Sequence, residues 1–163
     1  MKTIITNKIE FQKKEIKTLL DQLDPKISFQ VDRLVYYPYY FFEYSVKQHK
    51  FLRFMNRNGN IGCTIDSLSG TGALIDATPQ FNRYEASEDE LISSKLDVIT
   101  AQKEAEKYIY RSISLKMKIL QMPEMQLTKQ ELFYRPYWIA SSKTSDRSFS
   151  LAIDAISGKY HPL

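Results

Sequence analysis

The chain is poor in the residues that build metal centres and disulfide frameworks. Its 163 residues include one cysteine, Cys63, and two histidines, His49 and His161. A single cysteine excludes an internal disulfide framework and a thiolate-rich metal site. Neither histidine has a histidine or a glutamate three or four residues away, so no metal motif forms locally. We therefore expect no metal and no other cofactor. We expect Cys63 to be a buried, inert thiol, and a nucleophilic thiol is the alternative.

Glycine-rich loops and long apolar runs are also lacking. The segment 69–72 contains a short Gly-x-Gly, but it has no third glycine, no lysine and no following helix, which excludes a phosphate-binding loop. The longest apolar candidate, 36–44, is interrupted by Pro38 and Glu43, and the first residues contain no signal-peptide core. The sequence thus predicts no membrane span and a cytoplasmic protein, unless the chain is part of an anchored one.

What the chain does contain is an internal repeat. The segment 34–40, LVYYPYY, recurs 98 residues later as LFYRPYW, and the segment 64–70, TIDSLSG, recurs 88 residues later as AIDAISG. The shorter second spacing means that the first copy carries the longer hairpin. Matching landmarks in the same order predict two copies of one supersecondary unit. We expect a first repeat over 1–76, an acidic linker over 77–98 and a second repeat over 99–163.

Each repeat has the pattern of a helix followed by strands. Apolar residues at helical spacing predict helices over 9–23 and 99–118, and alternating aromatic residues over 36–44 indicate a long strand. The expected fold class is α+β, with two tandem helix-plus-antiparallel-strand units whose helices pack on an aromatic-rich sheet. Pro38 and Pro136 each lack a ladder donor, so they are expected at an edge, at a bulge or where a strand begins.

The aspartate of each repeat precedes a Ser-Gly pair. Asp66 with Gly70, and Asp154 with Gly158, are typical of turns in which the carboxylate accepts backbone N–H bonds and the glycine takes a positive φ. Two carboxylates in one cleft would instead allow acid/base catalysis. The turn role is favoured because both repeats need it to fold.

The helix, the Tyr-x-Pro-Tyr strand and the strand ending in Ile-Asp-x-x-Ser-Gly together resemble the PepSY-type domain. The resemblance covers about residues 9–70 and 99–163. It implies a sheet packed across a helix, as in cystatins, and a non-catalytic module that binds or restrains a partner protein. Such domains occur in tandem, beside peptidases, in propeptides and in envelope proteins.

The sequence therefore favours a non-enzymatic, protein-binding or regulatory role. Exposed aromatic residues of the two related strands would form the contact region. The members chosen are Tyr37, Tyr39, Phe41, Tyr137 and Trp138.

Nucleic-acid binding is the alternative, because the predicted hairpin 47–57 is basic. No acidic residue occurs between Tyr44 and Ile65, although the net charge of the whole chain is only +4. Cations next to aromatic residues on a sheet suit phosphates and stacked bases. The cations of this hairpin are Lys47, Lys50, Arg53 and Arg57.

Overall fold

The structure is a computed structural model, and it describes residues 1–47, 54–55, 59–117, 124–143 and 148–163. Strands dominate: 49% of the described residues lie in strands and 24% in helices. The elements are β1 (Lys2–Asn7), α1 (Lys13–Leu23), β2 (Phe29–Val46), β3 (Asn60–Asp66), β4 (Gly72–Ile75), β5 (Phe81–Ala86), the short 3-10 helix η2 (Glu88–Glu90), α2 (Val98–Met117), β6 (Met125–Lys143), β7 (Ser148–Asp154) and β8 (Tyr160–Pro162).

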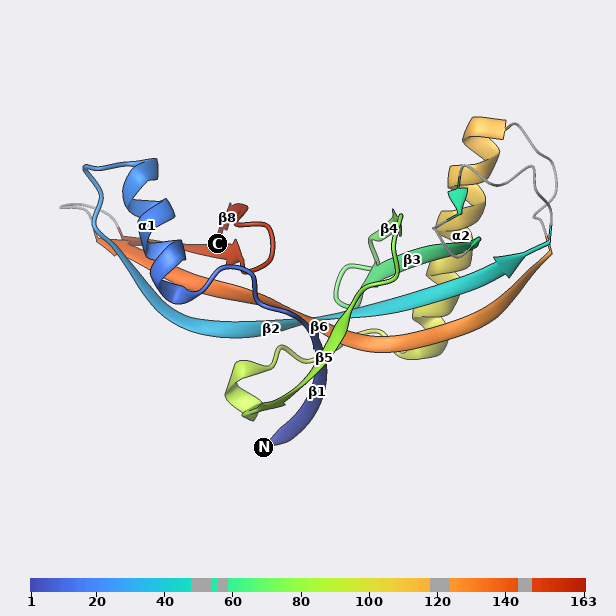
Figure 1. Ribbon diagram of the computed structural model, residues 1–163, viewed down its shortest axis with the longest axis horizontal. Helices are drawn as coiled ribbons and strands as arrows, with labels where there is room; N and C mark the ends of the chain where they lie inside the picture. The colour runs from blue at the N-terminus through green and yellow to red at the C-terminus, as the bar shows by residue number, and fades with distance from the viewer. Residues whose placement is uncertain (48–53, 56–58, 118–123, 144–147) are drawn as a thin grey trace. The chain divides into compact units, whose positions relative to one another are not determined.

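The described strands form one mixed sheet of eight strands (Figure 1). Its order is β4-β3-β2-β6-β1-β5, and β7 and β8 continue from β6. Most of the pairings whose direction is known are antiparallel, whereas β1 lies parallel to β6 at Thr6 and Tyr134. The predicted α+β class is confirmed, but the prediction of two tandem helix-plus-strand units is wrong.

The physical reason for this correction is that each helix packs against strands of the other repeat. Contacts divide the chain into two compact units, the first assembled from three separate segments and the second from two. The first unit combines residues 1–37, 80–92 and 134–163, and the second combines 38–79 and 93–133. Each unit thus takes a helix from one repeat and a hairpin from the other.

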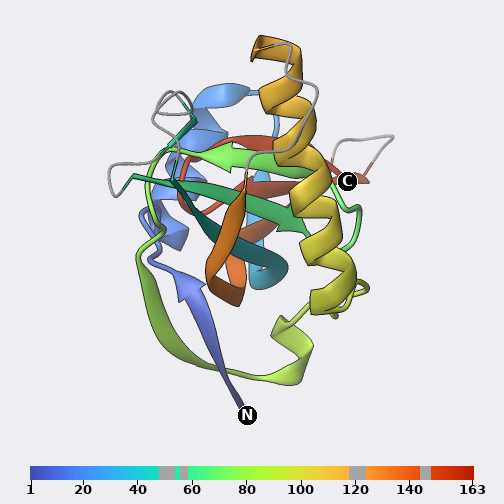
Figure 2. The same cartoon turned by 90° about the vertical axis from the view of Figure 1, so that its right-hand side faces the viewer.

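The core of the second unit lies between α2 and the strands β2 and β3 (Figure 2). The helix contributes four residues with no exposed surface, at a spacing of four residues. Because residues four apart share one face of a helix, they form a continuous apolar stripe. These residues are Ala101, Ala105, Ile109 and Ile113. The strands contribute Tyr40, Phe42, Tyr44, Ile61, Cys63 and Ile65.

The core of the first unit lies between α1 and strands that come mainly from the end of the chain. Ile16 and Leu20 are the two buried residues of α1, and they pack with Phe29 and Val31 of β2. The other members of this core are Ala140, Leu151 and Ile153. In Figure 1, α1 accordingly lies beside the red strands of the second repeat.

Matching hydrogen bonds fix the segment before each helix. The Trp138 indole donates to the carbonyl oxygen of Phe11 at 2.9 Å, and the Tyr40 hydroxyl donates to that of Leu96 at 3.0 Å. Tyr40 and Trp138 occupy the same place in the two copies of the aromatic motif. The first bond joins the two repeats, and the second joins the first repeat to the end of the linker, just before α2. In both cases the aromatic strand of one repeat holds the start of the helix that belongs to the other.

The two prolines lie inside the long strands, not at the ends of these strands. Pro38 and Pro136 are buried in β2 and β6. Each proline precedes the first residue that pairs with the next strand, which is Tyr39 with β3 and Tyr137 with β7. Because the pairing with β3 and with β7 begins only after the proline, neither ladder needs an N–H from it. The proline carbonyls accept N–H bonds from Ser67 and Ala155, the residues that follow those strands.

Candidate binding groove

An open groove of about 610 Å³ runs between the first turns of α1 and the beginning of β2, within the first unit. Helix α1 begins after Gln12, which makes a reciprocal capping box with Glu15. This cap determines where the helix starts and therefore which side chains of its first turns face β2. The lining residues are Gln12, Lys13, Lys14, Lys17, Phe29, Gln30 and Val31.

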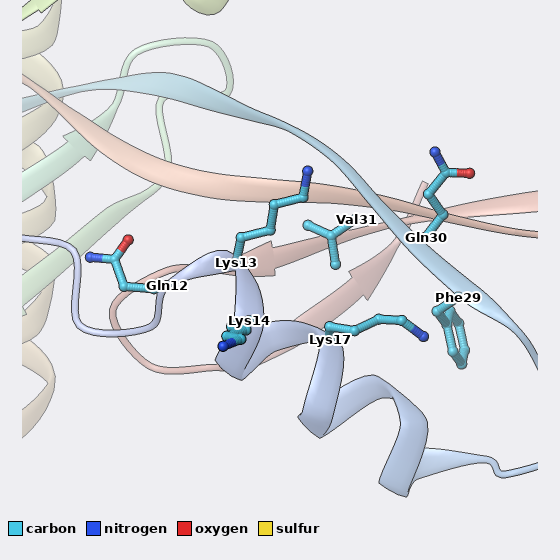
Figure 3. A pocket seen from close by; sticks show the side chains of 7 residues that line it. All are labelled: Gln12, Lys13, Lys14, Lys17, Phe29, Gln30 and Val31. Carbon is cyan, nitrogen blue, oxygen red and sulfur yellow. The ribbon is translucent and has the colours of Figure 1, made fainter.

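The helical side of the groove is basic. Lys13 and Lys14 are exposed, and among the described residues neither forms an ion pair. Lys17 is half-buried and forms an ion pair with Asp21 one turn further on, with 2.6 Å between Nζ and Oδ1. Figure 3 shows Lys13 rising toward Val31, and Lys17 extending toward Phe29.

The strand side of the groove is apolar where it faces the helix. Phe29 and Val31 alternate with the exposed Gln30, because successive side chains of a strand point to opposite faces. Both apolar side chains belong to the core beneath α1, so the floor of the groove is rigidly packed. The combination of cations and a fixed apolar floor suits a ligand that carries negative charge and an apolar group.

The expected aromatic contact residues lie elsewhere, and their rings are engaged within the protein. Phe41 is completely buried, with Lys129 Nζ lying 5.8 Å from its ring centroid, so it offers no contact surface. Tyr37 and Tyr137 meet edge to face at 6.2 Å, and Tyr39 stacks on Phe133 at 5.7 Å.

Trp138 is half-buried and takes part in holding the fold together. It packs against the core beneath α1 and donates the hydrogen bond to Phe11. With the exception of Phe41, the predicted aromatic residues are half-buried, and the ring contacts are those of an internal aromatic ladder.

The basic hairpin lies largely outside the described residues. Lys47 is described and exposed, whereas Lys50, Arg53 and Arg57 are outside the described ranges. Phe54, in the same stretch, is buried in the core of the second unit. At this position the apolar residue is therefore part of the core.

Both aspartates close the turns in which they lie. Oδ1 of Asp66 accepts N–H bonds from Leu68 and Ser69, at 2.8 and 3.1 Å. Oδ1 of Asp154 accepts the equivalent bonds from Ile156 and Ser157, at 2.8 and 3.4 Å.

The glycines of these turns have positive φ, as the turns require. The φ angles are 78° at Gly70 and 75° at Gly158. Asp154 also binds Arg135, with 2.7 Å between Oδ2 and the guanidinium nitrogen. Both carboxylates are thus engaged in structural bonds.

Cys63 lies on β3 with no exposed surface. Burial raises the pKa of its thiol from 9.0 to about 12, so the reactive thiolate is absent near neutral pH. We expect native protein at pH 8 to leave a thiol reagent such as dithiobis(nitrobenzoate) unreacted, and unfolded protein in urea to release one equivalent of the coloured product. Rapid reaction of the native protein would contradict the buried position.

The groove lysines were not selected from the sequence, although a signal was present. Lys13 and Lys14 stand in the first turn of α1, where the helix dipole disfavours cations. A pair of lysines at that position is therefore not explained by helix stability. The sequence does not show that β2 lies beside these lysines, and it is this position of β2 that creates the groove.

The fold and the groove together define an α+β protein that presents a basic groove with an apolar floor. No protein-family model matches the chain, and the searches of curated proteins and of solved structures found no match. No helix in the described ranges combines the length and apolar character of a bilayer span. Among the residues that the structure describes, no cluster of three or more His, Cys, Asp or Glu side chains is arranged to hold a metal ion.

Proposed function

We propose that the protein is a non-catalytic binding module that captures a segment of another protein in the groove between α1 and β2. The observation that carries this proposal is the groove itself, which is large enough for several amino-acid side chains and combines exposed cations with an apolar floor. Such a role is also what the resemblance to PepSY-type domains implies.

The chemistry of the lining supports binding over catalysis. The groove is lined by lysine, glutamine, phenylalanine and valine side chains, and the described part of its lining includes no carboxylate, imidazole, hydroxyl or thiol. General acid/base catalysis at neutral pH usually depends on such groups with pKa values near the working pH. The lysines are better suited to attract and orient a ligand of opposite charge.

A selection from a phage library of random dodecapeptides against the full chain tests the proposal. Enriched peptides should bind the protein and lose at least tenfold in affinity when the groove is blocked. Because Cys63 is buried, Lys13→Cys provides a single accessible thiol to which a bulky maleimide can be attached. The unlabelled Lys13→Cys variant separates the effect of the label from that of the lost charge.

A matched control places the same label on the other helix. Lys107 is exposed on α2, in the second unit, so labelled Lys107→Cys should bind the peptides as the wild type does. A selection that enriches no peptide, or peptides that bind equally well to protein labelled at position 13, would refute the proposed function.

A further inference from the structure

We propose that the partner segment is acidic and extended. This inference rests on the proposed function and names the chemistry of the partner. It requires that the charges of the groove be available to a ligand and that the groove accommodate an extended chain.

The charges point to an acidic partner. Lys13, Lys14 and Lys17 lie within two turns of one helix and line one groove. Because Lys13 and Lys14 form no ion pair among the described residues, a carboxylate of a partner would not have to displace an internal acid there. At Lys17 a carboxylate would compete with Asp21, whose ion pair is half-exposed and therefore weak.

The strand that forms the second wall is suited to an extended ligand. Strand β3 pairs with β2 from Tyr39 to Ser45, and Leu91 forms a bridge with Tyr36. Among the described residues, no strand pairs with the segment 29–35 of β2 on that side. An extended peptide can therefore lie along this segment and bring alternate side chains into the groove.

The composition of the peptides enriched from the dodecapeptide library tests this inference. We expect peptides rich in Asp and Glu, and binding that weakens as salt is raised. The double variant Lys13→Gln/Lys14→Gln should bind these peptides at least tenfold more weakly. It should unfold at an unchanged or slightly higher urea concentration, because both lysines are exposed and oppose the helix dipole.

The control with the same change of charge is Lys103→Gln/Lys107→Gln. Both of these lysines are exposed on α2. This variant should retain wild-type affinity, because the substituted positions lie in the other unit.

Three outcomes would overturn the acidic-partner inference. Enriched peptides that bind in the groove but are neutral or basic would leave the proposed function intact and remove the inference. A labelled single-stranded dodecanucleotide that binds more tightly than the peptides, through the same lysines, would identify nucleic acid as the occupant. Self-association in sedimentation that Lys13→Gln/Lys14→Gln abolishes would identify a second copy of the chain.

Discussion

Residues 1–76 and 77–163, produced as two separate fragments, are each expected to be unfolded, and they should recover the native structure when mixed. In the fragment 1–76, α1 lacks β6 and β7, and the strands β2 and β3 lack α2. A lone amphipathic helix of 11 residues is marginal in water without its packing partner. Far-UV circular dichroism and the dispersion of amide NMR signals would measure folding in each fragment and in the mixture.

The full chain cut by a protease between residues 76 and 77 is the control for this experiment. It contains the same peptide ends but forms from protein that has already folded, so it should retain native spectra. Cooperative unfolding of the isolated fragment 1–76 would contradict the exchange of helices between the repeats. It would show instead that a repeat can fold with its own helix.

Asp154→Ala is expected to destabilise the protein strongly, because this carboxylate both closes its turn and binds Arg135. The substitution removes two backbone N–H bonds to the carboxylate together with the ion pair. The side chain of Asp154 is 10% exposed, so Arg135 would lose a largely buried partner. We expect a loss of about 3 kcal/mol in the free energy of unfolding.

Urea denaturation followed by far-UV circular dichroism measures this loss. Asp154→Asn is the informative control, because the amide oxygen can still accept the turn N–H bonds while the charge that pairs with Arg135 is gone. It should fall between the wild type and Asp154→Ala. Wild-type stability in Asp154→Asn would mean that the Arg135 ion pair contributes nothing to stability.

Local chemistry made several features of the fold predictable. The turns at Asp66 and Asp154 depend on a carboxylate and a glycine a few residues apart, so their signal lies within one short segment. The buried stripe of α2 follows from apolar residues at a spacing of four. The start of α1 was harder to predict from the sequence. Its expected first residue was 9, whereas the helix begins at Lys13, after the capping box.

The burial of Phe41 and the position of the groove depend on contacts between distant segments. Alternation along β2 separates two faces, but both faces of this strand are covered near Phe41. The exposure of Phe41 could therefore not be predicted from the alternation of side chains along β2. The groove likewise forms only when the chain folds. Strand β2, which follows α1 in sequence, then brings Phe29 and Val31 beside the lysines of the helix.

By itself, the sequence determined that the chain is an α+β protein with two related halves, each with a helix, an aromatic strand and an aspartate turn. Only the tertiary structure decided which helix packs on which strands. The apolar stripe of a helix does not specify which strands the helix will cover, because hydrophobic burial is non-directional and the two repeats offer similar apolar faces. Bonds such as Trp138 to Phe11 and Tyr40 to Leu96 specify the exchanged arrangement, and they exist only once distant segments have met.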